Sequence, residues 1–347
     1  MDNFLRDARI NKNDEFYTLF SDIEKEIEKY LDYNPDLFRG KTVLCPCNDP
    51  LDSSFTIFFA QNFTKLGLKK LITTSYNTNG NDAEVHTLEP IQNSRVDIKN
   101  ISTKKLKGDG DFRSHEVKNF RDESDFIITN PPFSLFREFI SWIIEAKKKF
   151  IVIGNINCIA YKEIFPLLKD NRAWLGTGLG RWISGFVVPE WYPLHGTEAS
   201  ISPDGKKIVS TNSCLWLTNV THSKRHEPLS LMTMEDNLRY SKHKEIRSGG
   251  YKEYDNYNAI DVPFTDSIPS DYDGIMGVPL TFLDKYCPDQ FTIIGSAMGW
   301  THSVMSKEWK ESVGYKEDII SNSGTRGYGI VEGKQKYHRI LIAHKLI

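Results

Sequence analysis

Asp125-Phe-Ile-Ile-Thr-Asn-Pro-Pro-Phe133 is the segment from which the architecture of this chain can be worked out. Its first half is a short apolar run, which is typical of a strand buried on both faces of a parallel sheet. The strand has to end at Asn130, because the two prolines that follow lack the N–H groups that a sheet uses. A helix is predicted next, at about 134–148, and then a strand at 150–154. This order of strand, turn, helix and strand predicts an α/β fold.

Strands and helices alternate on both sides of this segment. Apolar residues at helical spacing predict a helix at 14–31, and a capping serine with an aromatic face predicts another at 53–66. Residues 77–100 are polar and weakly periodic, so we expect a loop or a small excursion there. Short apolar runs predict the other strands, at 41–45, 70–74, 173–175, 185–188, 214–218 and 337–342. The pattern predicts an α/β fold with a mainly parallel sheet.

The composition is that of a folded protein of ordinary charge. Of its 347 residues, 39% are hydrophobic and 26% are charged, which allows a sizeable core and excludes a disordered chain. The pattern of elements changes after about residue 222, so we expect a first α/β domain at 1–220 and a C-terminal extension at 221–347. The net charge of −2 excludes a uniformly basic nucleic-acid coat, but it allows a localised basic cleft.

Signals for membranes, secretion and metals are missing from the sequence. The best apolar run, Phe150–Gly154, is far shorter than the roughly 18 residues that span a bilayer. The first seven residues lack the apolar stretch of a signal peptide. The cysteines are too scattered for a disulfide framework, and Cys45 and Cys47 lack the second ligand pair of a zinc site. We therefore expect a cytoplasmic protein that has no metal and contacts no membrane.

The turn after the central strand is the strongest chemical signal. In an open α/β sheet, groups that handle ligands gather at the carboxyl ends of the strands. Pro131 and Pro132 fix the backbone and leave carbonyl oxygens, which join the Asn130 side chain as acceptors beside the ring of Phe133. Two acceptors on an aromatic amine would draw its nitrogen towards tetrahedral geometry and free the lone pair for attack, while Phe133 stacks on the base. The alternative is a rigid turn that only ends a strand.

A second signal is Cys45-Pro-Cys-Asn-Asp-Pro50, which follows the first predicted strand. A doubly wound fold binds its cofactor at this place, beside a helix N-terminus. A glycine-rich fingerprint is absent. The short polar residues Asn48 and Asp49, between Cys45 and Pro50, are suited to the amino or hydroxyl groups of a nucleoside.

A third signal is Gly108-Asp-Gly-Asp-Phe-Arg113. The carboxylate of Asp111 can accept a hydrogen bond from the amine of an adenine, and Phe112 can pack on the face of the same ring. The alternative is an ordinary surface turn, because Gly and Asp are common in turns.

Several stretches of the chain, in the same order along the sequence, match one known family. In these stretches the chain resembles the EcoRI adenine-specific DNA methyltransferase family, and their number and collinear order make the resemblance specific. They are Asp14-Glu-Phe-Tyr-Thr18, Gly67-Leu-Lys-Lys-Leu-Ile72, Gly108-Asp-Gly-Asp-Phe-Arg-Ser114, Thr129-Asn-Pro-Pro-Phe-Ser-Leu-Phe136, Tyr161-Lys-Glu163, Ser184-Gly-Phe-Val-Val-Pro-Glu190, Gly196-Thr-Glu-Ala199, Cys214-Leu-Trp-Leu-Thr-Asn219, Tyr254-Asp-Asn-Tyr257 and Gly277-Val-Pro-Leu-Thr-Phe-Leu283.

The resemblance implies a Rossmann-like S-adenosylmethionine-dependent methyltransferase fold with a mixed, mainly parallel sheet. It also implies that the enzyme acts on N6 of adenine in duplex DNA. It implies a cofactor site whose members are Phe16, Tyr17, Thr18, Cys45, Asn48, Asp49, Pro50, Asp111 and Phe112, and it makes Asn130–Phe133 the catalytic tetrapeptide. The target adenine has to be extruded, because its amine is paired inside the duplex. The chain departs from the usual pattern in two places, since its first loop has no FxGxG and Thr74-Ser-Tyr-Asn77 lacks the usual ribose-binding acid.

For DNA, we expect recognition outside the catalytic sheet, at 189–212 and in the C-terminal extension, and the resemblance implies GAATTC as a candidate target. Phe186 is a candidate for a second face on the extruded adenine, with core packing as the alternative. Candidates for phosphate contacts are Arg225, Arg239, Lys242 and Lys244, with a solvated surface as the alternative. We expect the protein to act on double-stranded DNA as a monomer, with a cognate restriction endonuclease that forms no stable complex with it.

Two other functions are compatible with parts of this pattern. An enzyme that methylates RNA or a protein glutamine amide solves the same chemical problem, but the long C-terminal region and the collinear resemblance favour DNA. A catalytically inactive DNA-binding homologue would keep the fold. The intact Asn130–Phe133 and Asp111–Phe112 argue against that reading.

Overall fold

The structure is a computed structural model that describes residues 17–47, 53–76, 83–91, 96, 98–177, 183–188, 190, 199–202, 205–210, 213–299, 301, 305–316 and 327–345. Its chain divides into two compact units. The first comprises Met1–Cys158 and Ala173–Ser223, and the second comprises Ile159–Arg172 and Lys224–Ile347. No helix within the described ranges is long and apolar enough to cross a membrane.

The first unit is built around an eight-stranded sheet with the order β5-β4-β3-β2-β6-β7-β12-β8. The strands are β2 (Thr42–Pro46), β3 (Lys70–Thr74), β4 (Glu84–Leu88), β5 (Ser102–Lys105), β6 (Phe126–Thr129), β7 (Lys149–Asn155), β8 (Trp174–Leu175) and β12 (Cys214–Thr218). The four central strands β3, β2, β6 and β7 are parallel, whereas the other pairings are antiparallel. The sheet is therefore mixed, and the expected parallel character is confined to its centre.

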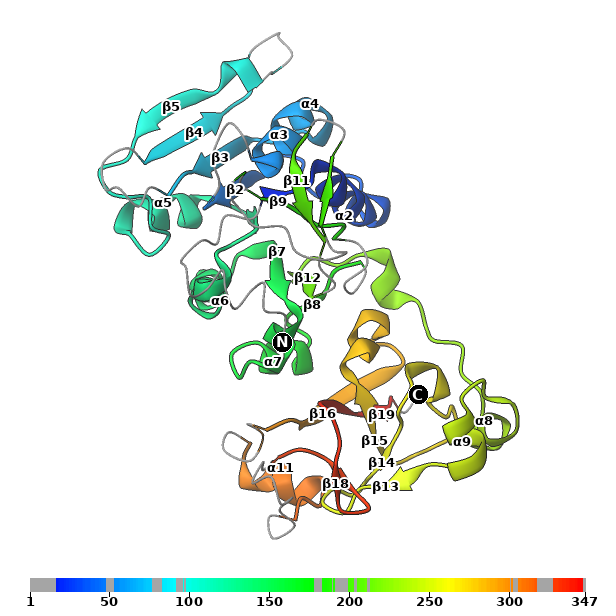
Figure 1. Ribbon diagram of the computed structural model, residues 1–347. Coiled ribbons are helices and arrows are strands. Elements are labelled where there is room, and N and C mark those ends of the chain that lie inside the picture. The colour runs from blue at the N-terminus through cyan, green and yellow to red at the C-terminus, as the bar shows by residue number, and fades with distance from the viewer. Residues whose placement is uncertain are drawn as a thin grey trace. The chain divides into compact units, whose positions relative to one another are not determined.

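Helices cover both faces of this sheet (Figure 1). On one face lie α2 (Phe20–Tyr33), α3 (Ser54–Gln61) and α4 (Phe63–Leu66), and on the other lie α5 (His115–Glu123) and α6 (Phe136–Glu145). Serine caps begin two of them, since the Ser53 hydroxyl accepts the N–H of Phe55 and the Ser114 hydroxyl accepts the N–H of Val117. Gly67 ends α4 with a φ of +64°, a conformation that costs glycine little.

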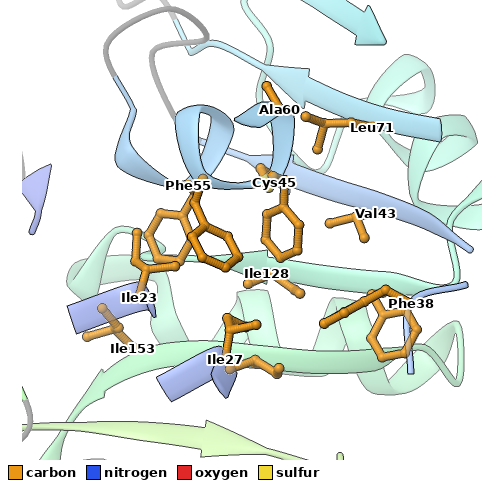
Figure 2. Close-up of a cluster of buried hydrophobic side chains, with 14 of the residues drawn as sticks. Ile23, Ile27, Phe38, Val43, Cys45, Phe55, Ala60, Leu71, Ile128 and Ile153 are labelled. Atoms are coloured by element: carbon orange, nitrogen blue, oxygen red, sulfur yellow. The ribbon is translucent and has the colours of Figure 1, made fainter. Parts of the chain in front are cut away.

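The main core of the first unit lies under α2 and α3. Figure 2 shows Val43 and Cys45 of β2 and Ile128 of β6 pointing into a cluster with Ile27 of α2 and Phe55 of α3. All five side chains are buried. Every second strand residue reaches this cluster, as the alternation of side chains along a strand requires. The burial of these apolar runs explains why the central strands form.

The outer part of the first unit was expected to contain a loop or a small excursion at 77–100. These residues contain the strand β4, which pairs with β3 in the main sheet. Val85 and Leu88 of β4 are buried, and the imidazole of the buried His86 lies 3.0 Å from a carboxylate oxygen of Glu84. The polar sequence conceals this strand because its stability depends on pairing with β3 rather than on a continuous apolar run.

A separate four-stranded antiparallel sheet has the order β1-β9-β11-β10. Its strands are β1 (Tyr17–Thr18), β9 (Phe186–Val188), β10 (Ala199–Ile201) and β11 (Lys207–Val209). The strand expected at 185–188 therefore forms, but it lies outside the main sheet. The expected N-terminal helix begins at Phe20 rather than at 14, because Tyr17 and Thr18 pair with β9 instead.

The second unit contains a five-stranded sheet with the order β13-β14-β15-β19-β16. Its strands are β13 (Lys252–Glu253), β14 (Ala259–Asp261), β15 (Ile275–Pro279), β16 (Phe291–Ala297) and β19 (Arg339–His344), and β17 (Ile330–Val331) and β18 (Lys334–Gln335) form a hairpin. Its helices include α7 (Phe165–Lys169), α8 (Met234–Tyr240), α9 (Lys244–Gly249) and α11 (Lys307–Ser312). The last predicted strand, β19, lies between β15 and the edge strand β16.

Candidate active site

The centre of the main sheet contains the point at which its strand order reverses. After β2 the chain adds β3 on one side, and β6 and β7 follow on the other side of β2. In open α/β sheets, ligands bind outside the carboxyl ends of the strands at such a point. The two strand ends are joined directly, because the Thr129 hydroxyl donates a 2.6 Å hydrogen bond to the carbonyl of Pro46. The turns that follow β2 and β6 therefore begin side by side.

Thr129→Val is expected to lower the free energy of unfolding by about 1–3 kcal/mol, since it keeps the shape of the side chain but removes the buried donor to Pro46. Denaturant unfolding of the purified protein measures this change. The matched control is Thr64→Val, at an exposed position in α4, where a change below about 0.5 kcal/mol is expected. Equal stability of the two variants would show that the hydroxyl bond does not hold the strand ends together.

The Asn130–Phe133 turn is fixed on both sides. Asn130 is half-buried and Pro131 is buried directly after β6. The chain then makes a short 3₁₀ turn at Phe133–Leu135, in which the Leu135 N–H bonds to the Pro132 carbonyl, and continues into α6. The first residue of α6, Phe136, lies so close to Gly154 of β7 that a Cβ there would be 2.6 Å from its ring. The acceptors predicted for this turn therefore stand on rigid backbone.

Three of the predicted site residues meet behind this turn. The ring of Phe133 contacts the ring of Phe186 edge to face, with centroids 6.4 Å apart and planes at 79°. Phe186 pairs directly with Thr18 across β9 and β1. Phe186 is fully buried, so its ring has no face available to a base in this structure. Core packing, the alternative for Phe186, is what the structure shows, and the ring supports Phe133 from behind.

The turn at 108–113 packs against the end of β3. Gly110 has a φ of +79°, and a Cβ there would lie 1.9 Å from the carbonyl oxygen of Ser75, the residue after β3. Asp111 of the same turn acts on Cys47, the residue after β2, since burial and then the charge of Asp111 raise the pKa of Cys47 to about 12. The ends of β2 and β3 and this turn therefore converge at one edge of the sheet.

Asp111 is held as an ionised carboxylate. Its Oδ1 accepts from the N–H and Nε of Arg113 at 2.7 and 2.9 Å, and its Oδ2 accepts from Nη2 at 2.6 Å. The bonds from Arg113 hold the pKa of Asp111 below its usual range. A carboxylate offers about four acceptor positions, so one is left after these three bonds. Asp111 can therefore accept a hydrogen bond from a ligand without losing Arg113.

Phe112, the residue after Asp111, is packed inside the first unit. Its ring is buried and meets Phe139 and Trp142 edge to face at 5.1 and 5.6 Å. These contacts anchor the turn to α6. Stacking of Phe112 on an adenine remains a prediction, and in this structure the ring serves as an anchor.

The structure corrects the role expected for Cys45. Its side chain is fully buried in the hydrophobic core, within the strand β2, and presents no surface to a ligand in this structure. Cys47, one residue past the end of β2, is half-buried and has a φ of +61°. The charge of Asp111 contributes to the raised pKa of its thiol. The sequence does not mark where this strand ends. Because β2 continues to Pro46, Cys45 lies within the strand and not in the turn that follows it. Four other predicted cofactor residues, Phe16, Asn48, Asp49 and Pro50, lie outside the described residues.

Two buried hydroxyls at this edge lack a hydrogen-bond partner among the described residues. They belong to Thr18 of β1, the neighbour of the exposed Tyr17, and to Thr74, the last residue of β3. An unsatisfied buried hydroxyl costs free energy unless a ligand or water pairs with it. Thr18 belongs to the predicted cofactor segment. Thr74 was missed, because a threonine at the end of a strand is inconspicuous in a sequence.

Arg225, expected to contact phosphates, is instead a buried residue of the second unit. It is 6% exposed and donates a hydrogen bond to the side chain of Asn171. Burial lowers its pKa to about 10. Since a guanidinium in that position presents almost no surface, we do not place it at an interface.

The other basic candidates lie on the surface of the second unit. Arg239 pairs with Glu235 one helical turn earlier, and Lys242 pairs with Asp266 at 2.6 Å. Lys244 is exposed at the start of α9. Exposed ion pairs contribute about 0–1 kcal/mol, so a phosphate can replace the carboxylates at little cost. Phosphate contacts by these three residues remain a prediction.

Three known proteins are similar to the chain along nearly its whole length. A sequence model of the family described as adenine-specific methyltransferase EcoRI matches residues 4–345. The chain is 41% identical to the type II methyltransferase M.EcoRI of Escherichia coli, an alignment that covers 98% of this chain and 96% of that protein. It is 33% identical to M.MpnI of Mycoplasma pneumoniae, with 99% and 98% covered, and 34% identical to M.MgeORF184P of Mycoplasma genitalium, with 98% of both covered. No solved structure matches the chain.

Proposed function

Since this chain belongs to the EcoRI family of adenine-specific methyltransferases, we propose that it methylates N6 of adenine in duplex DNA with S-adenosylmethionine as the donor. The observation that supports this most directly is the rigid Asn130–Phe133 turn beside the joined ends of β2 and β6. The 108–113 turn, with the remaining acceptor position of Asp111, lies at the same edge. Ligands of open α/β sheets bind at such strand ends, so we propose that this edge holds the acceptors for the amine next to a turn that binds the nucleoside of the cofactor.

The proposed mechanism depends on positioning rather than on a strong base. The Asn130 side-chain oxygen and the Pro131 carbonyl accept from the two N–H bonds of the adenine amine, so the nitrogen lone pair leaves the ring and is directed at the methyl group. When bound, S-adenosylmethionine would supply an electrophilic methyl group, because its sulfonium sulfur can keep the bonding electrons and become a neutral thioether. The proton lost from nitrogen passes to water. Holding the two reacting atoms in line supplies most of the acceleration.

The residues present fit this cofactor. Asp111 is ionised and has an acceptor position left for an amine or a hydroxyl. The hydroxyls of Thr18 and Thr74 have no partner within the described part of the chain, and a cofactor bound at the ends of β1 and β3 would satisfy them. We propose that Asp111, Thr18 and Thr74 bind S-adenosylmethionine. Thr74 stands where the usual ribose-binding acid is missing.

The extruded adenine needs a flat surface, and we propose that Phe133 supplies it. Phe133 is half-buried, so part of its ring is accessible. Phe186 braces it from behind rather than contacting the base. The two rings therefore divide the roles, one stacking on the base and the other holding the first in place.

Cys47 offers a direct probe of the cofactor site. All five cysteines are described, and Cys47 is the one that is not buried. We expect an alkylating agent at pH 8 to label the folded protein at Cys47, slowly because its pKa is raised to about 12. Bound S-adenosylmethionine should slow the labelling further. Peptide mass spectrometry identifies the labelled thiol, and the unfolded protein is the control in which all five react.

Labelling at Cys45 before Cys47 would contradict the core position assigned to Cys45. Labelling of Cys47 at the same rate with and without S-adenosylmethionine would contradict the proposed position of the cofactor.

The function itself is tested by transfer of a labelled methyl group from S-adenosylmethionine to defined substrates. Transfer is expected to a duplex that contains GAATTC, the candidate target, and to vanish when the adenines of that site already carry N6-methyl groups. Sequencing that maps methylated adenines in long DNA then establishes the site without assuming it. Transfer to RNA or to a glutamine peptide instead would support the alternative enzymes. Binding of DNA without any transfer would support an inactive homologue.

We further propose that the protein acts as a monomer and forms no stable complex with a cognate endonuclease. A monomer modifies a palindrome one strand at a time, so a hemimethylated duplex should accept one methyl group with ordinary efficiency. Light scattering of the free protein and of its complex with DNA measures the stoichiometry.

A further inference from the structure

Tyr337 is the most exposed large hydrophobic side chain among the described residues, with 80% of its surface open to solvent. Its ring stacks on the imidazole of His338, with centroids 5.3 Å apart and planes at 30°. The ring of Tyr328 lies 5.3 Å from the same imidazole. We call these three rings the aromatic stack. Its outer member is solvent-exposed, and the other two are half-buried.

A hydrogen bond fixes the inner part of the aromatic stack. The Tyr328 hydroxyl and the Nε2 of His338 are 2.9 Å apart. Burial lowers the pKa of His338 below its ordinary value, so the imidazole is neutral at pH 7 and above and can accept from the hydroxyl. The Tyr328 ring also lies against Gly299, where a Cβ would be 2.7 Å from it. The rings of His338 and Tyr328, which support Tyr337, are therefore held in place.

The backbone that carries Tyr328 is anchored by buried polar side chains. Asn256 donates to the Tyr328 carbonyl at 2.7 Å and accepts from the N–H of Ile330 at 2.9 Å. The hydroxyl of Tyr257 donates to the Gly327 carbonyl at 2.8 Å. Asn256 and Tyr257 are 1% and 3% exposed, so these bonds are shielded from water. They explain the Tyr254-Asp-Asn-Tyr257 segment as a structural anchor for the aromatic stack.

Basic residues flank Tyr337 in the sequence. Residues 333–347 contain Lys334, Lys336, Arg339 and Lys345 but no Asp or Glu. Lys336 and Arg339 are held beside the stack by the buried Asp261, at 3.4 and 2.9 Å. Lys334 is exposed. Exposed lysines next to a flat ring attract a polyanion that also presents flat groups.

A single exposed aromatic residue on a protein surface needs no explanation. Tyr337 differs because its ring is supported by the rings of His338 and Tyr328, and because the exposed Lys334 and the partly exposed Lys336 lie close to it in the sequence. Little conformational entropy is lost when such a ring meets a partner. Stacking of one base on an aromatic side chain contributes about 1–3 kcal/mol to binding.

We infer that Tyr337 stacks on a base of the bound DNA, with His338 and Tyr328 as its support. Bases become accessible to such a ring where a protein kinks or opens the duplex. The inference rests on the proposed function, because it names a contact by which the second unit engages the DNA substrate.

Tyr337→Ala is expected to weaken binding of a GAATTC duplex about 5- to 150-fold. Tyr337→Phe keeps the ring and should bind like the wild type. The matched control is Tyr240→Ala, since Tyr240 is 68% exposed on α8 of the same unit but stacks on no ring within the described residues. Fluorescence anisotropy over a range of salt concentrations measures affinity and salt dependence. Stacking is not ionic, so Tyr337→Ala should leave the salt dependence unchanged.

Photocrosslinking adds a direct readout. A duplex substituted with 5-iodouracil should attach to the peptide that contains Tyr337. Wild-type affinity of Tyr337→Ala for the duplex would overturn the inference. If Tyr337→Phe lost as much affinity as Tyr337→Ala, the contact would be made by the hydroxyl and not by the ring. A shallower salt dependence of DNA binding by Tyr337→Ala would show that Tyr337 contacts a phosphate and not a base.

The inference and the proposed function fail in different experiments. If the wild type methylates DNA and Tyr337→Ala binds normally, the stacking contact is wrong and the function stands. If the wild type binds DNA through Tyr337 but transfers no methyl group, the contact stands and the function is wrong.

Discussion

Replacement of Asn130 by alanine is expected to lower the rate of methyl transfer about 10³-fold, as when one preorganised polar group is removed from an active site. The residue follows the buried strand β6 and precedes two prolines, so its side chain is presented from rigid backbone. In the proposed mechanism its oxygen is one of two acceptors on the adenine amine. Single-turnover kinetics with labelled cofactor measure the rate of the chemical step.

The dissociation constants of cofactor and DNA should stay near their wild-type values in the same variant, because neither depends on this amide. Asn119→Ala, at an exposed position on α5, is the matched control and should leave both rate and binding unchanged. A variant at Asn130 that loses cofactor affinity in proportion to turnover would identify a binding residue rather than an acceptor for the amine.

The centre of the first unit was predictable because its strands are continuous apolar runs. The strands predicted at 70–74 and 214–218 have the same bounds in the structure, as β3 and β12. The strand β4 was not predictable in the same way. Only some of its residues are buried, and it forms because its backbone pairs with β3. A partner that is distant in sequence leaves no local pattern.

The candidate site was predictable by residue type but not by contact. Asn130 and Asp111 stand out as acceptors in turns, yet nothing local shows that Thr129 bonds to Pro46 or that Phe186 braces Phe133. Whether a predicted side chain is available to a ligand depends on its burial, which the sequence does not show. Arg225 resembles its basic neighbours in the sequence, and only its packing beside Asn171 separates a structural arginine from one available to DNA.

Replacement of Gly110 by alanine is expected to weaken cofactor binding on the order of 10²-fold, because it displaces Asp111 from the site. An alanine at a φ of +79° costs about 1–2 kcal/mol by itself. Its Cβ would also lie 1.9 Å from the Ser75 carbonyl oxygen, a backbone atom that cannot rotate away. The 108–113 turn therefore has to move. Isothermal titration with S-adenosylmethionine measures the loss of affinity.

Gly108→Ala is the matched control, since a Cβ there meets nothing within 4 Å and wild-type affinity is expected. Thermal unfolding of both variants shows whether the turn moves within a folded protein. At saturating cofactor, Gly110→Ala should transfer the methyl group at nearly the wild-type rate, whereas Asn130→Ala should bind cofactor normally and transfer it slowly. If both variants changed the same parameter, the edge of the sheet would not be divided into a cofactor-binding turn and an amine-binding turn. The roles inferred from the joined ends of β2 and β6 would then be wrong.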